Sequence, residues 1–374
     1  MKNHRRRRSF CALLLVTALL CSLAACSGAP SAVVPTERDP SARTISLINY
    51  NVAGLPKIFG NQAEDVGANQ ETIGAQLAER DFDIAAVQED FGYHKHLLTG
   101  LGDAYPHRTV HSGGVPGGDG LNLYSRYPLY NETRTPWDAS YGIIDDGADE
   151  MTPKGILYAL IALEDGVYLD FYDIHADAYG DEGSIAAREV QFKQLAALLQ
   201  SRTVDRPVIV TGDFNTSLHH ENDSGLYENL MVECGLTDVW IALYNDGITD
   251  DFSAHLDSKD RWDGIEKVLY RSGGGVALTP EAFAYTYLTD DDGVSLSDHP
   301  AVICSFTYAL TADFVPMEEA VSITERNYLS FALNKVRYIA VDLWKIISNG
   351  EQLWKYIEPE IEKFVGKVKE VFSS

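Results

Sequence analysis

Residues that can bind a metal ion or a phosphate stand at the ends of several short runs typical of β-strands. They are Asn51, Glu89, Asp213, Asn215, Asp298 and His299. Hydrolysis of a phosphate ester needs a cation to offset developing charge, a base to activate water, and donors around the phosphate oxygens. Carboxylates and carboxamides are the ligands that Mg²⁺ selects. Each residue alone is more often a turn or cap residue than a ligand, so the prediction of a hydrolytic site depends on the whole set.

The segments that carry these residues resemble, in order, the signatures of the endonuclease/exonuclease/phosphatase superfamily. The segments are NYNVAGLP, DIAAVQE, GDGLNLYSRYPL, DIHADA, TGDFN and LSDHP, and the resemblance extends over residues 44–308. It implies a four-layered α/β/β/α sandwich and Mg²⁺-dependent cleavage of phosphate esters, with Mn²⁺ or Ca²⁺ as alternative ions. An ordered set of segments is more specific than any single motif.

The resemblance implies one group of residues for the metal and another for acid–base chemistry. Glu89 would be the principal metal ligand, and Asn51 and Asp298 would support the metal or the phosphate beside it. Asp213 and His299 would share the activation of water and the transfer of a proton to the phosphate. The resemblance leaves open which of these two is the base.

Three further residues complete the implied site. Asn215 would hold a phosphate oxygen through its amide, and His175 would donate to the phosphate or protonate the leaving oxygen. A histidine satisfied by hydrogen bonds at a strand end is the alternative for His175. The family usually has an aspartate that orients the last histidine. This sequence offers Glu266 there, with Asp263 three residues earlier, so a longer side chain must be accommodated.

Alternating β-rich and helical runs must position these residues. Strands are predicted at 44–52, 84–88, 121–125, 156–163, 167–174, 208–211, 267–270 and 301–308, and helices at 69–80, 184–200 and 225–234. In the second helix, Val190, Leu195, Leu198 and Leu199 lie close to one apolar stripe. Strands that follow strands, with helices between others, indicate two packed mixed sheets with helices outside. We expect one domain over residues 43–310.

The first 25 residues predict a signal peptide, because the basic residues 5–8 precede a short apolar run at 10–20. Cys26 follows Leu23, Ala24 and Ala25, which resembles the bacterial lipoprotein box, whose cysteine is acylated. A plain signal peptide with an incidental cysteine is the alternative. Residues 26–42 would form a flexible tether, and the lipid would hold the exported domain at the outer face of the cell membrane.

Residues 311–374 predict a C-terminal amphipathic helical extension, because apolar residues repeat there at helical spacing without a further strand signal. With 8 basic and 10 acidic residues, this extension is the least acidic part of the chain. Such a stripe can lie on a membrane or pack on the domain, and packing is the commoner use.

Charge and export favour a lipid substrate. Cleavage of the leader would remove five of the 30 basic residues and none of the 55 acidic ones, which leaves a net charge of −30. Such a surface disfavours nucleic acid. NYNVAGLP and IHADA also resemble secreted sphingomyelinase-like members more than DNA-repair members. We therefore expect a monomeric phosphodiesterase that acts on a membrane phospholipid such as sphingomyelin.

Two other functions stay open, because the resemblance does not choose a substrate. An extracellular nuclease would need scattered basic residues to converge, such as Arg108, Arg126, Lys154, Arg188 and Lys267. A catalytically silent binding lipoprotein would have kept the sandwich without the chemistry.

Other cysteines and histidines have no recognisable ligand spacing. Cys234 and Cys304 could form one bridge, but we expect two buried thiols. The remaining histidines are expected to be surface or loop residues: His94, His96, His107, His111, His219, His220 and His255. The glycine-rich stretch 113–120 predicts a flexible loop before Asn122, a site-adjacent polar residue in the family.

Overall fold

The computed structural model describes residues 43–56, 63–115, 118–142, 149–150, 152, 154–203, 205–218, 222–244 and 264–317. The predicted leader and tether, and nearly all of the predicted C-terminal extension, lie outside these residues and stay predictions. Asp263 and three of the histidines, His219, His220 and His255, also lie outside them. Within the described part of the chain, no helix is both long enough and apolar enough to cross a membrane.

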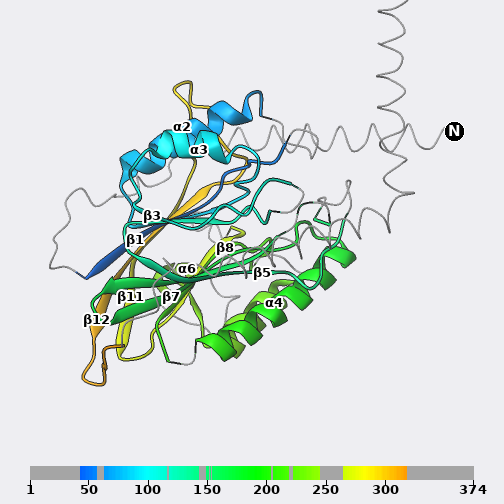
Figure 1. The fold of residues 1–374 in the computed structure, drawn as a ribbon. Helices are drawn as coiled ribbons and strands as arrows, with labels where there is room; N and C mark the ends of the chain where they lie inside the picture. The colour runs from blue at the N-terminus through cyan, green and yellow to red at the C-terminus, as the bar shows by residue number, and fades with distance from the viewer. Residues whose placement is uncertain are drawn as a thin grey trace, which may run out of the picture. The chain divides into compact units, whose positions relative to one another are not determined.

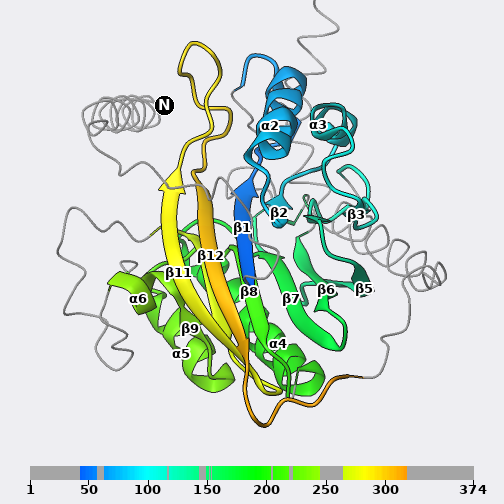
Figure 2. The ribbon, with the colours of Figure 1, turned by 90° about the vertical axis from the view of Figure 1, so that its left-hand side faces the viewer.

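Within the described residues, the strands form two six-stranded sheets. Sheet A contains, in spatial order, β11 (Val276–Thr286), β12 (Ala301–Leu310), β1 (Thr44–Asn51), β2 (Ile84–Gln88), β4 (Asn122–Ser125) and β3 (His107–Arg108). Sheet B contains β5 (Leu129–Pro136), β6 (Gly155–Glu164), β7 (Val167–His175), β8 (Val208–Asp213), β10 (Glu266–Arg271) and β9 (Thr237–Asp238). Figure 2 shows β11, β12 and β1 side by side in sheet A.

Helices cover the outer face of each sheet, which gives the predicted four layers. The helices are α2 (Val66–Arg80), α3 (His94–Leu101), α4 (Glu182–Arg202), α5 (Ser224–Cys234) and α6 (Val239–Tyr244). Figure 1 shows α2 and α3 over sheet A, and α4 on the opposite side, under sheet B. One apolar cluster joins the layers and includes residues of both sheets, such as Leu47, Leu123, Phe171 and Val210. The predicted sandwich is confirmed.

Two βαβ units place the ends of parallel strands together. Strand β1 runs parallel to β2 with Asn51 opposite Gln88, and β7 runs parallel to β8 with His175 opposite Asp213. Parallel strands need a crossover, which α2 supplies in sheet A and α4 in sheet B. Both helices begin at an aspartate cap: Asp65 accepts from the backbone of Ala68, and Asp181 accepts from two amides of the first turn of α4.

The structure corrects the predicted apolar stripe of α4. Leu195 and Leu199 are buried and Leu198 packs partly against the core, but Val190 is 43% exposed. Val190 lies five positions from Leu195, about 140° around the helix axis. The buried face instead includes Phe192 and the polar residues Arg188 and Gln191, which bond to neighbouring loops.

The predicted strands all occur, with ends shifted by a few residues, but the two-residue strands β3 and β9 and the longer strands β5 and β11 were not predicted. Strand β5 is mostly polar, with the sequence LYNETRTP, and it lies at the edge of sheet B. Strand β11 lies at the edge of sheet A and has a register shift between Pro280 and Ala282. The two cysteines, Cys234 and Cys304, are both buried and free, as predicted.

Candidate active site

Six of the eight predicted site residues meet where β1, β2, β7 and β8 end and where β10 begins. Asn51 joins the two sheets there: its Nδ2 lies 3.2 Å from Glu89 Oε1 and 3.1 Å from Asp213 Oδ2. The Oδ1 atom of Asn51 accepts from the backbone N–H of Ala53 (3.0 Å). In this orientation Asn51 presents its amide N–H groups, not its oxygen, to the two carboxylates.

Asp213 is the centre of the group. Its Oδ2 atom lies 3.5 Å from His175 Nε2 and 3.6 Å from His299 Nδ1, in addition to the contact with Asn51. Its Oδ1 atom accepts from the backbone N–H of Asn215 (3.0 Å). The side chain is fully buried. One carboxylate oxygen therefore faces both predicted histidines at once.

Glu266 reaches His299 despite its additional methylene group. Its Oε1 atom accepts from His299 Nδ1 at 2.6 Å, whereas its buried Oε2 atom has no hydrogen-bond partner within the described ranges. Burial alone would lower the pKa of His299, but the hydrogen bond to Glu266 and the negative charges of Asp213 and Glu266 raise it to about 10. The arrangement therefore holds His299 as an imidazolium with Nδ1–H directed at Glu266.

His175 has the opposite electrostatic setting. It is 1% exposed, and burial, reinforced by the positive charges of Lys154 and His299, lowers its pKa well below the usual range. Its Nδ1 atom has no hydrogen-bond partner among the described residues. The two histidines around Asp213 thus differ in charge, because burial dominates at His175, whereas His299 has a hydrogen-bonded carboxylate in Glu266.

Glu89 has the surroundings expected of a metal ligand. Its backbone is in the left-handed region with φ of 60°, and Gly54 packs so closely on its carbonyl that a Cβ there would lie 2.3 Å from the oxygen. Burial raises the pKa of Glu89 to about 7, although the charges of His299 and Lys154 act against this. A carboxylate that is costly to ionise by burial is stabilised by a bound cation. Its oxygen donors therefore fit Mg²⁺.

Asp298 and Asn215 are placed differently from the buried group. The side chain of Asp298 is 82% exposed, and its Oδ1 lies 4.0 Å from His299 Nε2. The predicted role of Asp298 at the metal stays a prediction. Asn215 has φ of 52° and donates through Nδ2 to the carbonyl oxygen of Ala176 at 3.1 Å.

Lys154 lies at this site, although from the sequence it was named only among the scattered basic residues that a nuclease would need. It is buried, pairs with Asp149 and donates to the carbonyl oxygen of Ala176 (3.1 Å). Burial acts to lower its pKa, but the pairing with Asp149 raises it above its ordinary value. Its positive charge acts to lower the pKa of Glu89 and of His175, and it attracts the carboxylate of Asp213. Its position two residues before the predicted strand 156–163 was the available signal.

The side chain of Gln88, next to Glu89, joins the two sheets by hydrogen bonds. Gln88 Nε2 donates to Asn49 Oδ1 (2.8 Å) in sheet A and to Asp173 Oδ1 (2.6 Å) in sheet B. Burial raises the pKa of Asp173 well above its usual range. Protonation of Asp173 avoids the cost of a buried charge. The hydrogen bond from Gln88 to Asp173 holds the residue before Glu89 against β7, the strand that ends at His175.

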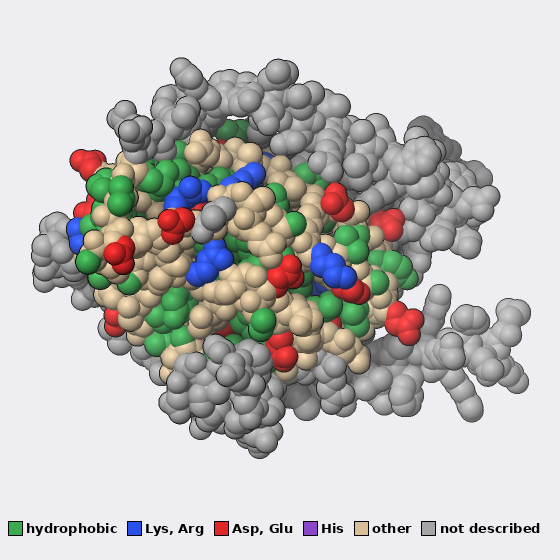
Figure 3. Space-filling view, turned by 90° about the horizontal axis from the view of Figure 1, so that it is seen from below, with side chains coloured by type: hydrophobic (Ala, Val, Ile, Leu, Met, Phe, Trp, Pro, Cys, Tyr) green, Lys and Arg blue, Asp and Glu red, His purple; other side chains and the backbone are tan. Residues whose placement is uncertain are grey.

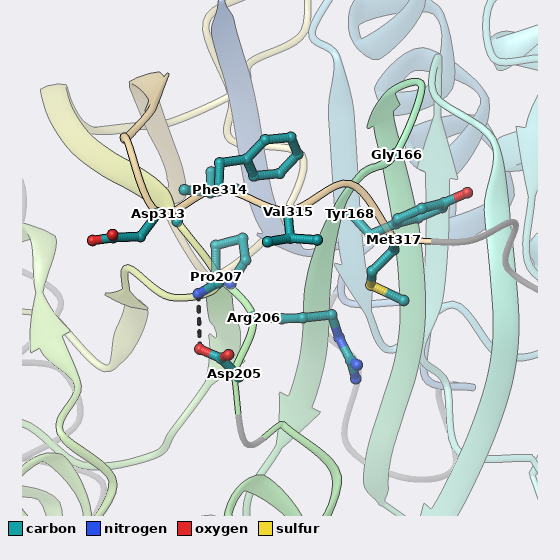
Figure 4. A pocket seen from close by; sticks show the side chains of 12 residues that line it. Gly166, Tyr168, Asp205, Arg206, Pro207, Asp313, Phe314, Val315 and Met317 are labelled. Atoms are coloured by element: carbon teal, nitrogen blue, oxygen red, sulfur yellow. Dashed lines mark hydrogen bonds between the residues drawn. The ribbon is translucent and has the colours of Figure 1, made fainter.

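A cavity of about 290 Å³ lies at the other end of sheet B and is separate from this site. Its walls come from the starts of β7 and β8, the β10–β11 turn and the segment after β12 (Figure 4). Tyr168, Arg206, Phe314, Val315 and Met317 are among its lining residues. The parallel strands that end at the active site begin here, so the two sites lie at opposite strand ends.

The chain is similar in sequence to known enzymes. The chain is 29% identical over 280 residues to the sphingomyelinases of Mycobacterium bovis and Mycobacterium tuberculosis, which is 73% of this chain and 54% of each relative. The chain thus spans about half the length of these relatives.

Solved structures show the same fold at low identity. A humanised D. rerio TDP2 is 17% identical and covers 71% of this chain and 100% of its own, with a TM-score of 0.52. A mutant beta toxin from Staphylococcus aureus with bound magnesium ions is 15% identical and covers 70% of this chain and 98% of its own, with a TM-score of 0.50.

A family model provides the assignment. It matches residues 48–299, which include every predicted site residue from Asn51 to His299. The chain belongs to the Endonuclease/Exonuclease/phosphatase family.

Proposed function

We propose that this protein is a Mg²⁺-dependent phosphodiesterase that cleaves a membrane phospholipid such as sphingomyelin at the cell surface. The observation that carries the proposal is the convergence on Asp213 Oδ2 of Asn51, His175 and His299. Half-buried Glu89 and buried Glu266 supply two further carboxylates. The mycobacterial relatives named as sphingomyelinases support the choice of lipid, and the acidic surface supports a cationic headgroup over a nucleic acid.

Glu89 would hold the metal ion, with Asn51 beside it and Asp298 at the exposed rim. The ion would offset negative charge on the phosphate and polarise its P–O bonds. Asp213 would accept the proton of the attacking water, because His299 already carries one at neutral pH and cannot act as a base. His299 would donate from Nε2 to a phosphate oxygen while Glu266 keeps Nδ1–H in place.

The remaining residues would position the phosphate. Uncharged His175 would direct a ring N–H at the substrate, and Asn215 would orient the turn that follows Asp213. Lys154 would place a fixed positive charge behind the carboxylates, which favours their ionised forms. The resemblance left open which of Asp213 and His299 is the base. In this proposal Asp213 is the base and His299 is the proton donor.

The direct test is release of phosphocholine from sphingomyelin vesicles by the purified protein, with Mg²⁺ and with a chelator. Supercoiled plasmid and inositol phosphates are assayed in parallel. We expect Mg²⁺-dependent release from sphingomyelin that Asp213→Ala abolishes. Cleavage of plasmid or inositol phosphate alone would refute the lipid substrate, and equal activity of Asp213→Ala would refute the site.

An extracellular nuclease is less well supported by the basic residues that the structure describes. Arg126 pairs with Asp81, Arg188 with Asp223 and Lys267 with Asp238, so these cations are already compensated. On the face shown in Figure 3, the Lys and Arg side chains (blue) are interspersed with Asp and Glu side chains (red). Binding of a nucleic-acid strand would require uncompensated basic residues along its path.

We also propose export and attachment to the outer face of the membrane through a lipid on Cys26. The supporting observation is the small-residue cluster before that cysteine. Metabolic labelling with a radioactive fatty acid should mark the wild-type chain and leave Cys26→Ser unlabelled. Equal labelling of the two chains would refute the anchor at this residue.

The C-terminal extension is proposed to assist action on membranes. Residues 311–317 pack on the domain: Thr311 N–H donates to Gly275 O, and Met317 N–H donates to Gly166 O. A chain that ends at Met317 keeps those contacts and is therefore the appropriate truncation. It should lose more activity on vesicles than on a soluble chromogenic diester. Equal losses would indicate packing, and no loss would refute the membrane role.

A further inference from the structure

Two histidines that the sequence analysis assigned to loops or the surface lie together on a buried carboxylate. They are His94, the first residue of α3, and His111, in the loop between β3 and β4. Asp90, directly after Glu89, is 1% exposed and joins them. Its Oδ2 atom accepts from His94 Nδ1 at 2.7 Å, and its backbone carbonyl accepts from His111 Nε2 at 3.0 Å.

The two imidazole rings stack on each other. Their centroids are 3.9 Å apart and their planes differ by 5°. One ligand atom from each of Asp90, His94 and His111 lies within 4.8 Å of the other two. Two imidazoles and a carboxylate at this spacing are a ligand set that proteins use for Zn²⁺ and similar ions.

The two carboxylate oxygens of Asp90 differ in their hydrogen bonds. Oδ2 of Asp90 also accepts from Asn122 Nδ2 (2.9 Å) and Tyr124 Oη (2.8 Å), whereas the buried Oδ1 has no hydrogen-bond partner in the part of the chain that the structure describes. Buried polar atoms without a partner are uncommon, and an unplaced ion is one explanation. Asn122 and Tyr124 would keep the carboxylate oriented while Oδ1 binds a cation, as outer-shell partners do in metal sites.

The loop that carries Asp90 is fixed before any ion binds. The backbone N–H of Asp90 donates to Gly120 O (2.9 Å), and Gly120 has φ of 68°. A Cβ at Gly120 would lie 2.6 Å from the ring of Phe91. Only glycine therefore fits this contact, which holds Asp90 and Phe91 in place directly after Glu89.

We propose that Asp90, His94 and His111 form a second metal site, which selects an imidazole-preferring divalent cation such as Zn²⁺. On binding, His94 coordinates as a neutral imidazole: the ring proton is then on Nε2, so that Nδ1 offers its lone pair to the ion, and Asp90 Oδ1 supplies the carboxylate ligand. Mg²⁺ prefers an all-oxygen set, so this site is chemically distinct from the one at Glu89.

The test is Zn²⁺ titration of the full chain, purified without a histidine tag and freed of metal by a chelator, with excess Mg²⁺ present. We expect one tightly bound Zn²⁺ in the wild type. His94→Gln and His111→Gln should each weaken its binding by at least about a hundredfold, as expected for loss of a direct ligand. Glu89→Gln should bind Zn²⁺ like the wild type.

Matched controls come from the same region. His96 lies on the same helix, 52% exposed, and His96→Gln should leave Zn²⁺ binding unchanged. A rise in melting temperature on Zn²⁺ addition, present in the wild type and His96→Gln and absent in His94→Gln, separates lost binding from misfolding. Equal Zn²⁺ affinity in the His94, His111 and His96 variants would overturn the proposal, as would displacement of all Zn²⁺ by Mg²⁺ or loss of the ion in Glu89→Gln.

Discussion

The side-chain amide of Asn51 donates to Asp213 across 3.1 Å, from the end of β1 in sheet A to the end of β8 in sheet B. A second contact runs from the same nitrogen to Glu89 (3.2 Å). Two carboxylates on different sheets are thereby held by one neutral donor. Their separation depends on the packing of the sandwich as well as on the local turns.

Asn51→Ala should therefore reduce both stability and turnover. Loss of a buried donor to two carboxylates is expected to cost about 1–3 kcal/mol of unfolding free energy. Activity should fall by on the order of a hundredfold, because the carboxylates are no longer held in register. Urea unfolding and initial rates measure these effects. Asn51→Asp adds a third carboxyl group and should be worse at neutral pH than at acid pH. Wild-type activity in the alanine variant would contradict the bridging role.

Glu266 sets the charge of His299, so Glu266→Gln should shift the pH dependence of the enzyme. Without the carboxylate, the raised pKa of about 10 for His299 should move toward its ordinary value of 6.5. The alkaline limit of activity, where His299 loses its proton, should move to lower pH in the same direction. A profile of kcat against pH is the measurement, and Glu266→Asp is the control that retains the charge. An unchanged alkaline limit in Glu266→Gln would show that another group sets it.

The same contact makes folding depend on pH. Because the pKa of His299 is raised in the folded protein, its contribution to stability is fully present below pH 6.5 and is lost as pH rises through about 10. Unfolding free energies of the wild type should fall across this window more steeply than those of His299→Gln. Parallel curves for the two proteins would contradict the assignment.

Lys154 is expected to matter more than any exposed lysine of the chain. Lys154→Gln leaves Asp149 buried without its partner, which should cost about 3–5 kcal/mol. Lys193 offers the matched control, because its side chain is 71% exposed and pairs with Glu189 on the helix surface. Lys193→Gln should change stability by less than about 1 kcal/mol. Similar unfolding midpoints for the two variants would refute the buried-pair account.

Much of the site could be predicted from the sequence because its residues stand at strand ends. Asn51 and Asp213 follow apolar runs, and the carboxyl ends of parallel strands meet at one edge of a sheet. The family resemblance suggested that Glu266 pairs with His299, and the position of Glu266 at the start of a predicted strand selected it. Family resemblance supplied the roles, which spacing alone does not give.

Other features depend on tertiary contacts that a linear pattern does not contain. Lys154 is buried because Asp149 and the carbonyl of Ala176 meet it there. His94 and His111 lie 17 positions apart, yet the fold stacks them. Strands β3, β5, β9 and β11 were missed, and all four lie at sheet edges, where one side of the strand needs no partner and polar residues and proline are tolerated. Strands β3 and β9 also have only two residues each.

Removal of the metal should destabilise the folded protein through Glu89. Its pKa rises from 4.5 to about 7 on folding, so metal-free stability should fall as pH rises through this window. At a pH of about 8, Glu89→Gln should make the metal-free protein more stable by on the order of 2 kcal/mol. Mg²⁺ should raise the melting temperature of the wild type and leave that of Glu89→Gln unchanged, because the variant lacks the charge that binds the ion. Differential scanning calorimetry with a chelator and with Mg²⁺ measures both effects. An equal Mg²⁺ shift in the two proteins would place the ion elsewhere.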